Sequence, residues 1–244
     1  MQTSSGAKLD FGRVALLLVF LGVGGFFWDS PALWPLKVLV VMIHESGHAL
    51  ATLLAGGAVD RITLAAHESG ACLSRLPATH FAQVAVYSAG YVGSALAGAF
   101  LLLATFRFRL RRLVLVAASV GLAVMGVLYA GDGFTLAFCL GTALALGLAA
   151  KYLPDGGVDM VNLFLSAFTA LYVAFDLRSA LGHGAAAHSV SDASLLANLT
   201  PVPSWAWAAI WSFVSLALLG LFARWSLRAA RPEGLGSSLL SGRR

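Results

Sequence analysis

Hydrophobic residues lie in long runs along this chain, and short polar or charged segments separate the runs. A helix needs about 20 apolar residues to cross a bilayer, and the runs reach or approach that length. They cover residues 14–28, 33–54, 79–106, 113–130, 134–152, 158–177 and 205–227. The pattern predicts an all-α polytopic membrane protein with about six to seven transmembrane helices.

One segment departs from the helical pattern. Between residues 58 and 76 the apolar positions alternate at short spacing, and Glu68, Ser69 and Gly70 are typical of a turn. We therefore predict a β-hairpin after the second run, lying outside the hydrocarbon or against protein because strand edges cannot face lipid. Two roles are open for it: pairing its edge with an extended substrate strand, or serving as a simple connection.

The composition excludes an ordinary soluble enzyme. Hydrophobic residues make up 59% of the chain and charged residues only 11%, with a mean hydropathy of +0.85. The net charge of +5 comes from short basic blocks at the ends of apolar runs, which favours contact with the lipid bilayer and no nucleic acid partner. Cys72 and Cys139 are far apart, so neither a disulfide framework nor a cysteine-based zinc site is expected.

The positive charges predict an orientation. With seven crossings and the amino terminus outside, eleven of the sixteen Lys and Arg residues lie inside, against five for the reverse. If the first run does not cross, the other six helices keep this orientation and the amino terminus moves inside. We expect residues 1–227 to form a single transmembrane domain, followed by a basic, disordered tail over residues 228–244.

The second run carries the clearest chemistry. Residues 44–48 read His-Glu-Ser-Gly-His, the pattern H-E-x-x-H, and on a helix His44 and His48 face the same side, so both can reach one Zn²⁺. Glu45 is placed to take a proton from an activated water and pass it to a leaving amine. Ionisable groups within a membrane span are costly and usually functional. A metal site is therefore favoured over a buried polar cluster.

A zinc hydrolase needs a third protein ligand and an open position for water. Asp176 is the favoured candidate because it ends an otherwise apolar helix, although capping that helix or pairing with a nearby arginine would also explain it. Asp155 and Asp159, in or near an interhelical loop, are the second choice. Glu68 and His67 are the third, because two glycines and the hairpin separate them from the motif.

The sequence resembles the site-2-protease family (M50) of intramembrane zinc metalloproteases, in its M50B-like bacterial branch. The resemblance rests on residues 44–51 (HESGHALA), 56–57, the hairpin ending near residue 70, and residues 88–94, 171–176 and 191–193. It implies that His44, His48 and Asp176 bind one zinc ion per chain and that Glu45 is the general base. Better-known members carry an Asn-Pro-Asp-Gly-like motif around the ligating aspartate. It is absent around Asp176, and its nearest match here contains Asp155.

We therefore expect a zinc metalloendopeptidase that cleaves membrane proteins within or next to the bilayer. By family likeness, the substrate is a single-span membrane protein, for example an anti-sigma factor, and the location is a bacterial inner or plasma membrane. Two alternatives remain: a proteolytically inactive scaffold or chaperone, and a metal or proton transporter. A stripe of small residues in the third run (Gly90, Gly93, Ser94, Ala97 and Gly98) is interpreted as packing within the bundle rather than dimerisation.

Overall fold

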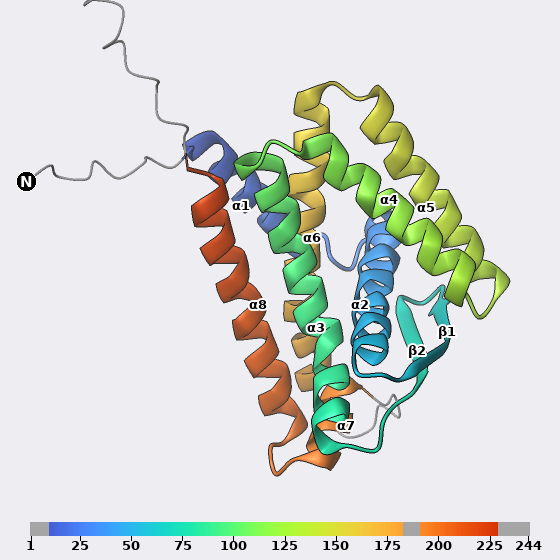
Figure 1. Ribbon diagram of the computed structural model, residues 1–244. Helices are drawn as coiled ribbons and strands as arrows, with labels where there is room; N and C mark the ends of the chain where they lie inside the picture. Colours follow the sequence, from blue (N-terminus) through green and yellow to red (C-terminus); the bar gives the residue numbers. More distant parts are fainter. Residues whose placement is uncertain (1–9, 183–190, 229–244) are drawn as a thin grey trace, which may run out of the picture.

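The structure, a computed structural model, describes residues 10–182 and 191–228, and of residues 173–182 it describes the backbone alone. The predicted tail beyond residue 228 lies outside the described part. Helices dominate, and one small sheet lies at the side of the bundle next to α2 (Figure 1). In chain order the elements are α1 (Phe11–Phe26), η1 (Pro31–Leu33), α2 (Trp34–Leu54), β1 (Ala58–Ala65), β2 (Ser69–Arg75), α3 (His80–Leu102), η2 (Leu103–Arg107), α4 (Arg111–Tyr129), α5 (Gly133–Tyr152), α6 (Asp155–Gly182), α7 (Asp192–Leu199) and α8 (Ser204–Ser226).

Short polar residues start several of these helices, as helix-capping chemistry requires. The side chains of Asp10, Thr79, Asp132 and Ser191 each accept a hydrogen bond from the backbone N–H three residues ahead, at the beginnings of α1, α3, α5 and α7. Each bond satisfies a donor that the first helical turn leaves free. The predicted runs 14–28, 79–106 and 134–152 therefore begin close to the caps of α1, α3 and α5.

Five helices in the described part, α2, α3, α4, α5 and α8, are long and apolar enough to cross a membrane. This confirms an all-α, multi-pass membrane protein. Helix α1 is shorter, and the backbone N–H of Asp10 donates to the carbonyl of Leu227 over 2.7 Å. The two ends of the described chain therefore meet at one face. This contact favours the alternative in which the first run does not cross over seven crossings with termini on opposite sides.

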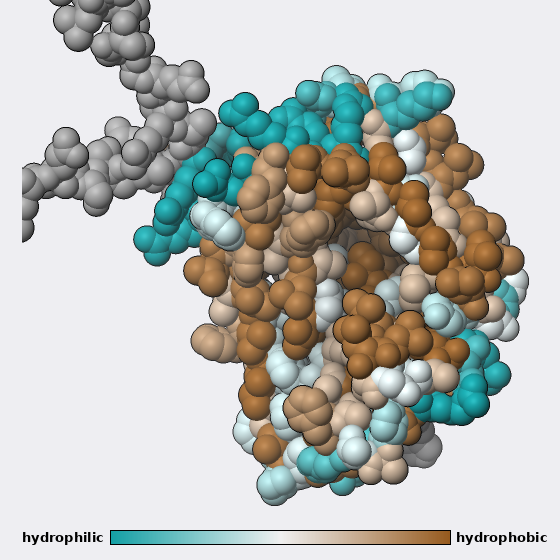
Figure 2. Space-filling view, viewed as in Figure 1, coloured by the Kyte–Doolittle hydropathy of each residue, from teal (hydrophilic) through white to brown (hydrophobic). Residues whose placement is uncertain are grey.

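The face where the two ends meet is also strongly charged. Arg111 and Arg112, at the start of α4, form ion pairs with Asp155, and Arg111 also pairs with Asp159. Arg13 lies over the Phe106 ring at the same face. Figure 2 shows hydrophilic residues gathered along this end, above a broad apolar surface. Basic groups at a membrane boundary are typical of the cytoplasmic side.

Small residues bring α3 close to its neighbours. A methyl group added at Gly47 of α2 would lie 2.5 Å from the carbonyl oxygen of Ala89, and one at Gly98 would lie 2.3 Å from Oγ1 of Thr169 in α6. Gly93 faces Gly47 in the same way. The stripe of small residues thus serves packing within this chain, as predicted.

The predicted hairpin is present and lies against protein. Strands β1 and β2 pair antiparallel, with an irregularity between Val59 and Arg61. The other edge of β1 is occupied, because Gly131 donates to the carbonyl of Ile62 (2.8 Å) and the N–H of Leu64 donates to Oγ1 of Thr135 (2.8 Å). The sheet has two strands, so the second edge of β2 pairs with no other strand in the described part of the chain.

Candidate metal centre

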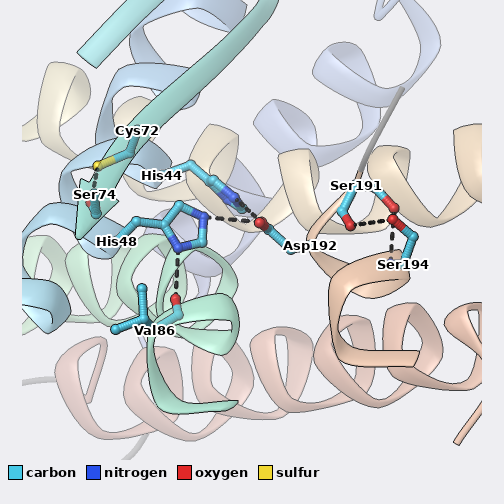
Figure 3. Close-up of polar contacts among 8 residues, drawn as sticks. All are labelled: His44, His48, Cys72, Ser74, Val86, Ser191, Asp192 and Ser194. Carbon is cyan, nitrogen blue, oxygen red and sulfur yellow. Dashed lines mark hydrogen bonds and ion pairs between the residues drawn. The ribbon is translucent and has the colours of Figure 1, made fainter. Parts of the chain in front are cut away.

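The two histidines of the motif lie one turn apart on α2, and their rings are close. Their centroids are 4.7 Å apart. Nε2 of His44 lies 2.8 Å from Oδ2 of Asp192, and Nε2 of His48 lies 3.0 Å from the same oxygen (Figure 3). One ligand atom from each of the three residues falls within 4.8 Å of the others, so this group could hold a metal ion.

The second ring nitrogen of His48 fixes how this imidazole can bind. Nδ1 donates to the backbone carbonyl of Val86 on α3 over 2.7 Å. A neutral imidazole carries one proton, so with Nδ1 protonated its Nε2 offers a lone pair toward the carboxylate of Asp192. A cation between Nε2 and the carboxylate resolves this conflict, and an imidazole whose other N–H is held by a carbonyl is the usual arrangement of a metal ligand.

Asp192 reaches the histidines because a short helix begins at that point. Ser191 caps α7 by accepting from the N–H of Ser194, which places Asp192 in the first turn. Burial alone would raise the pKa of Asp192, but the imidazoles of His44 and His48, each within 3.0 Å of its Oδ2 atom, hold the pKa of this carboxyl below its usual range. The aspartate is therefore in the ionised form that a metal ion requires.

Glycine at position 90 leaves room for this cluster. A Cβ atom built on Gly90 of α3 would lie 2.2 Å from Nε2 of His44 and 2.5 Å from Nε2 of His48. These are the two nitrogen atoms that face Asp192. Any side chain at this position would thus occupy the space where the three ligand atoms converge.

Glu45 lies beside the ligand group and is buried, with 6% of its surface exposed. The hairpin covers it: the Cβ of a side chain at Gly70 would lie 2.9 Å from Cγ of Glu45. The carboxylate is also within hydrogen-bonding reach of the backbone of Cys72. A carboxylate next to the first histidine and held against a strand edge is well placed to exchange protons there.

A cavity of about 440 Å³ opens over these residues. One wall is strand β2 from Gly70 to Ser74, and His44, Glu45, His48 and Asp192 line the cavity as well. The ring edges of Tyr91 and Tyr172 surround His44, with centroids 4.9 and 5.5 Å from its own. The cavity is large enough for a short stretch of extended chain lying along β2.

The other predicted ligands whose side chains are described have other partners. Asp155 and Asp159 pair with Arg111 at the charged face. Glu68 forms an ion pair with Lys37, and Nε2 of His67 lies 3.0 Å from Oγ of Ser69. None of the four belongs to the described metal group. Asp176 lies on α6, but its side chain is outside the described part, so its role as a ligand stays a prediction.

Sequence reasoning did not assign Asp192 as a ligand. Residues 191–193 entered the prediction only as part of the family resemblance. A local signal was present: Ser191 followed by Asp192 and then by apolar residues is a helix start. The signal predicts α7, but nothing local predicts that α7 points toward α2.

The fold and the site define a multi-pass membrane protein with two buried histidines and a partly buried aspartate that could hold a metal ion. The chain matches the family described as Peptidase M50B-like over residues 14–222. It therefore belongs to that peptidase family, and the resemblance found in the sequence is confirmed. The search of curated proteins and the search of solved structures each returned no significant match.

Proposed function

We propose that this protein is an intramembrane zinc metalloendopeptidase that cleaves single-span membrane proteins within or next to the bilayer. The observation that carries the proposal is the convergence of His44, His48 and Asp192 on one point beside the buried carboxylate of Glu45. Two imidazoles and one carboxylate are a donor set that zinc hydrolases use, and such sites keep a further position for water.

The residues present fit a zinc ion. The ring of His48 is oriented by Val86, Asp192 is ionised, and Gly90 leaves the space between the ligand atoms free. When bound, zinc supplies Lewis-acid activation of a water molecule and of the scissile carbonyl. We assign Asp192 as the third ligand in place of Asp176.

Glu45 supplies the proton chemistry. Its carboxylate would accept a proton from the attacking water and transfer it to the nitrogen of the leaving amine. Burial against Gly70 and β2 keeps the carboxylate from swinging away from the cavity, so the proton is accepted and released at one place. Hydrolysis requires both transfers, and no second carboxylate of the described group is free for them because Asp192 holds the histidines.

The unpaired edge of β2 is proposed to hold the substrate. A transmembrane helix hides its carbonyl groups in internal hydrogen bonds, so the cleaved segment must unwind. An unwound segment lying along β2 would regain backbone hydrogen bonds from that edge. Its scissile bond would then lie between Glu45 and the histidines, because all of them line the cavity that β2 borders.

The alternatives in the sequence gain no support from the structure. A transporter would need ionisable groups along a path through several helices, but the buried acidic, basic and histidine side chains of the described residues, Lys37, His44, Glu45 and His48, all lie on α2. An inactive scaffold would have no use for Glu45 beside a metal group. We place the protein in a bacterial inner or plasma membrane, with the charged face cytoplasmic.

The first test is zinc content by elemental analysis of detergent-purified protein. We expect about one zinc per native chain, no zinc in His44→Ala or Asp192→Ala, and full zinc in Asp176→Ala and Asp155→Ala. Zinc lost in Asp176→Ala and kept in Asp192→Ala would assign the third ligand to Asp176. An absence of zinc from every sample, even after supplementation, would favour the scaffold.

The second test is cleavage of reconstituted single-span proteins by native protein and by Glu45→Gln. This variant keeps the ligands, so we expect it to bind zinc normally but to cleave about 10²- to 10⁴-fold more slowly. Equal rates for the two proteins would rule out Glu45 as the general base. Asp155→Asn, which alters a carboxylate at the charged face, is the matched control and should cleave at the native rate.

A further inference from the structure

Lys37 is a buried cation on the helix that carries the metal ligands. It lies in the first turn of α2, 5% exposed, and its Nζ is 2.6 Å from Oε1 of Glu68. The Trp28 ring lies 5.8 Å from the ammonium group on another side. A buried lysine costs several kcal/mol unless a counter-charge meets it, so Glu68 determines where this charge can be accommodated.

Glu68 lies in the hairpin turn, directly before β2. Its φ of 66° is in the left-handed region, which residues other than glycine rarely adopt. Its side chain also lines the cavity over the metal group. The ion pair with Lys37 thus holds the turn in a conformation that most residues would avoid.

Two further contacts tie the hairpin to the same face of α2. The indole N–H of Trp34 donates to the carbonyl of Ala66 over 2.6 Å, and Gly70 lies against Val41 and Glu45. Positions 34, 37, 41 and 45 are three or four residues apart, so they form one stripe along the helix. The face of α2 that presents Glu45 therefore also contacts the hairpin, and these contacts set the position of β2 along the helix.

We propose that the Lys37–Glu68 pair positions strand β2 relative to Glu45 and so selects which substrate bond is cleaved. This inference rests on the proposed peptidase activity. Both residues are positioning residues: they act through the hairpin and do not touch the reacting atoms. A displacement of β2 along α2 would move the bound strand past Glu45, and misplacement by about 1 Å can cost about 10²-fold in rate.

A second ion pair in the hairpin serves as a control for the first. At its base Arg75 pairs with Asp60, with Nη2 of Arg75 2.8 Å from Oδ1 of Asp60, but the Arg75 side chain is 76% exposed. An exposed pair of this kind contributes little to holding a structure. The same hairpin thus carries one pair at its turn, whose lysine is buried, and one pair at its base, whose arginine is exposed.

The experiment compares Lys37→Met, Glu68→Gln and the double variant with Asp60→Asn and with native protein in lipid nanodiscs. Zinc content checks the site, steady-state cleavage gives kcat and KM, mass spectrometry locates the cleaved bonds, and hydrogen exchange reports on β2.

For Lys37→Met and Glu68→Gln we expect normal zinc content, kcat lowered about 10- to 100-fold and KM within about twofold of native. We also expect additional cleavage sites and faster hydrogen exchange in β2. Lys37→Arg, which keeps the charge, should restore most of the rate, and Asp60→Asn should match the native protein.

Unchanged kcat, cleavage sites and exchange in Lys37→Met and Glu68→Gln would overturn the proposal. So would loss of zinc in Glu68→Gln alone, because Glu68 would then act as a ligand. If native protein cleaves nothing and matches Glu45→Gln, the proposed function fails by itself. Hydrogen exchange then still decides whether the pair positions β2, since exchange does not depend on cleavage.

Discussion

The site region and the α4–α5 pair are built on different principles. In the site region (α2, α3, α6, α7 and the hairpin) polar side chains are buried among protein, including His44, Glu45, Ser94 and Ser166. The pair α4 and α5 is exposed over most of its surface, and its one fully buried polar side chain is Thr135, which contacts the hairpin. An apolar hollow of about 370 Å³, lined by residues of α2 to α6, lies between the two regions (Figure 2).

The difference shows where chemistry can be placed in a membrane protein. A polar group facing lipid has no partner, so α4 and α5 are restricted to apolar surface. Polar groups are stable in the membrane only where neighbouring helices surround them. Small residues such as Gly90 and Gly98 allow helices to approach that closely. Function is thus concentrated where packing is tightest.

The largest expected effect comes from removing the space at Gly90. In Gly90→Ala the new methyl group would collide with both Nε2 atoms, so we expect loss of bound zinc and of cleavage. Gly121→Ala on α4, where nothing lies within 4 Å of the added carbon, is the matched control. It should keep its zinc and gain about 0.5–1 kcal/mol of stability from higher helix propensity. Elemental analysis measures the bound zinc of both variants, and thermal unfolding measures their stability. Full zinc in Gly90→Ala would contradict the assigned site.

A smaller effect is expected where the two regions meet. Thr135→Val removes the hydroxyl that accepts from Leu64 of β1 and donates to Asp132, at 2.8 and 2.9 Å. Leaving the buried N–H of Leu64 unpaired should lower the free energy of unfolding by about 1–3 kcal/mol. Unfolding in detergent measures the change, with Thr135→Ser as the control that keeps the hydroxyl. Native stability in Thr135→Val, which keeps the volume of the side chain, would show that the hydroxyl does not hold the hairpin.

The smallest expected effect comes from removing single interhelical hydrogen bonds donated by serine, which occur in both regions. Ser119 on α4 donates to the carbonyl of Ala143 over 2.6 Å, and Ser166 on α6 donates to the carbonyl of Gly98 over 2.7 Å. Ser119→Ala should cost about 0.6 kcal/mol, typical of interhelical bonds in membranes, and Ser166→Ala more, toward about 1.7 kcal/mol. Steric trapping in bilayers would resolve the two values. The reverse order would show that burial does not separate the regions.

The sequence by itself determined the helices, the hairpin and three of the site residues. The length of the apolar runs sets the helices, and short alternation sets the hairpin. His44, Glu45 and His48 follow from one motif because a single helix fixes their spacing whatever surrounds it. These are local properties, and local periodicity is enough to predict them.

Only the tertiary structure decided what meets that motif. Asp192 lies 144 residues beyond His48, and the packing of α7 against α3 and α8 brings it to the histidines, with Val86 of α3 holding the ring. The contact between Asp10 and Leu227 likewise brought the two ends of the described chain to one face, and the pairing of Lys37 with Glu68 joined the hairpin to α2. Spacing along a chain fixes which residues share a helix face. Which distant carboxylate reaches that face depends on how the helices pack, and no short stretch of sequence contains that information.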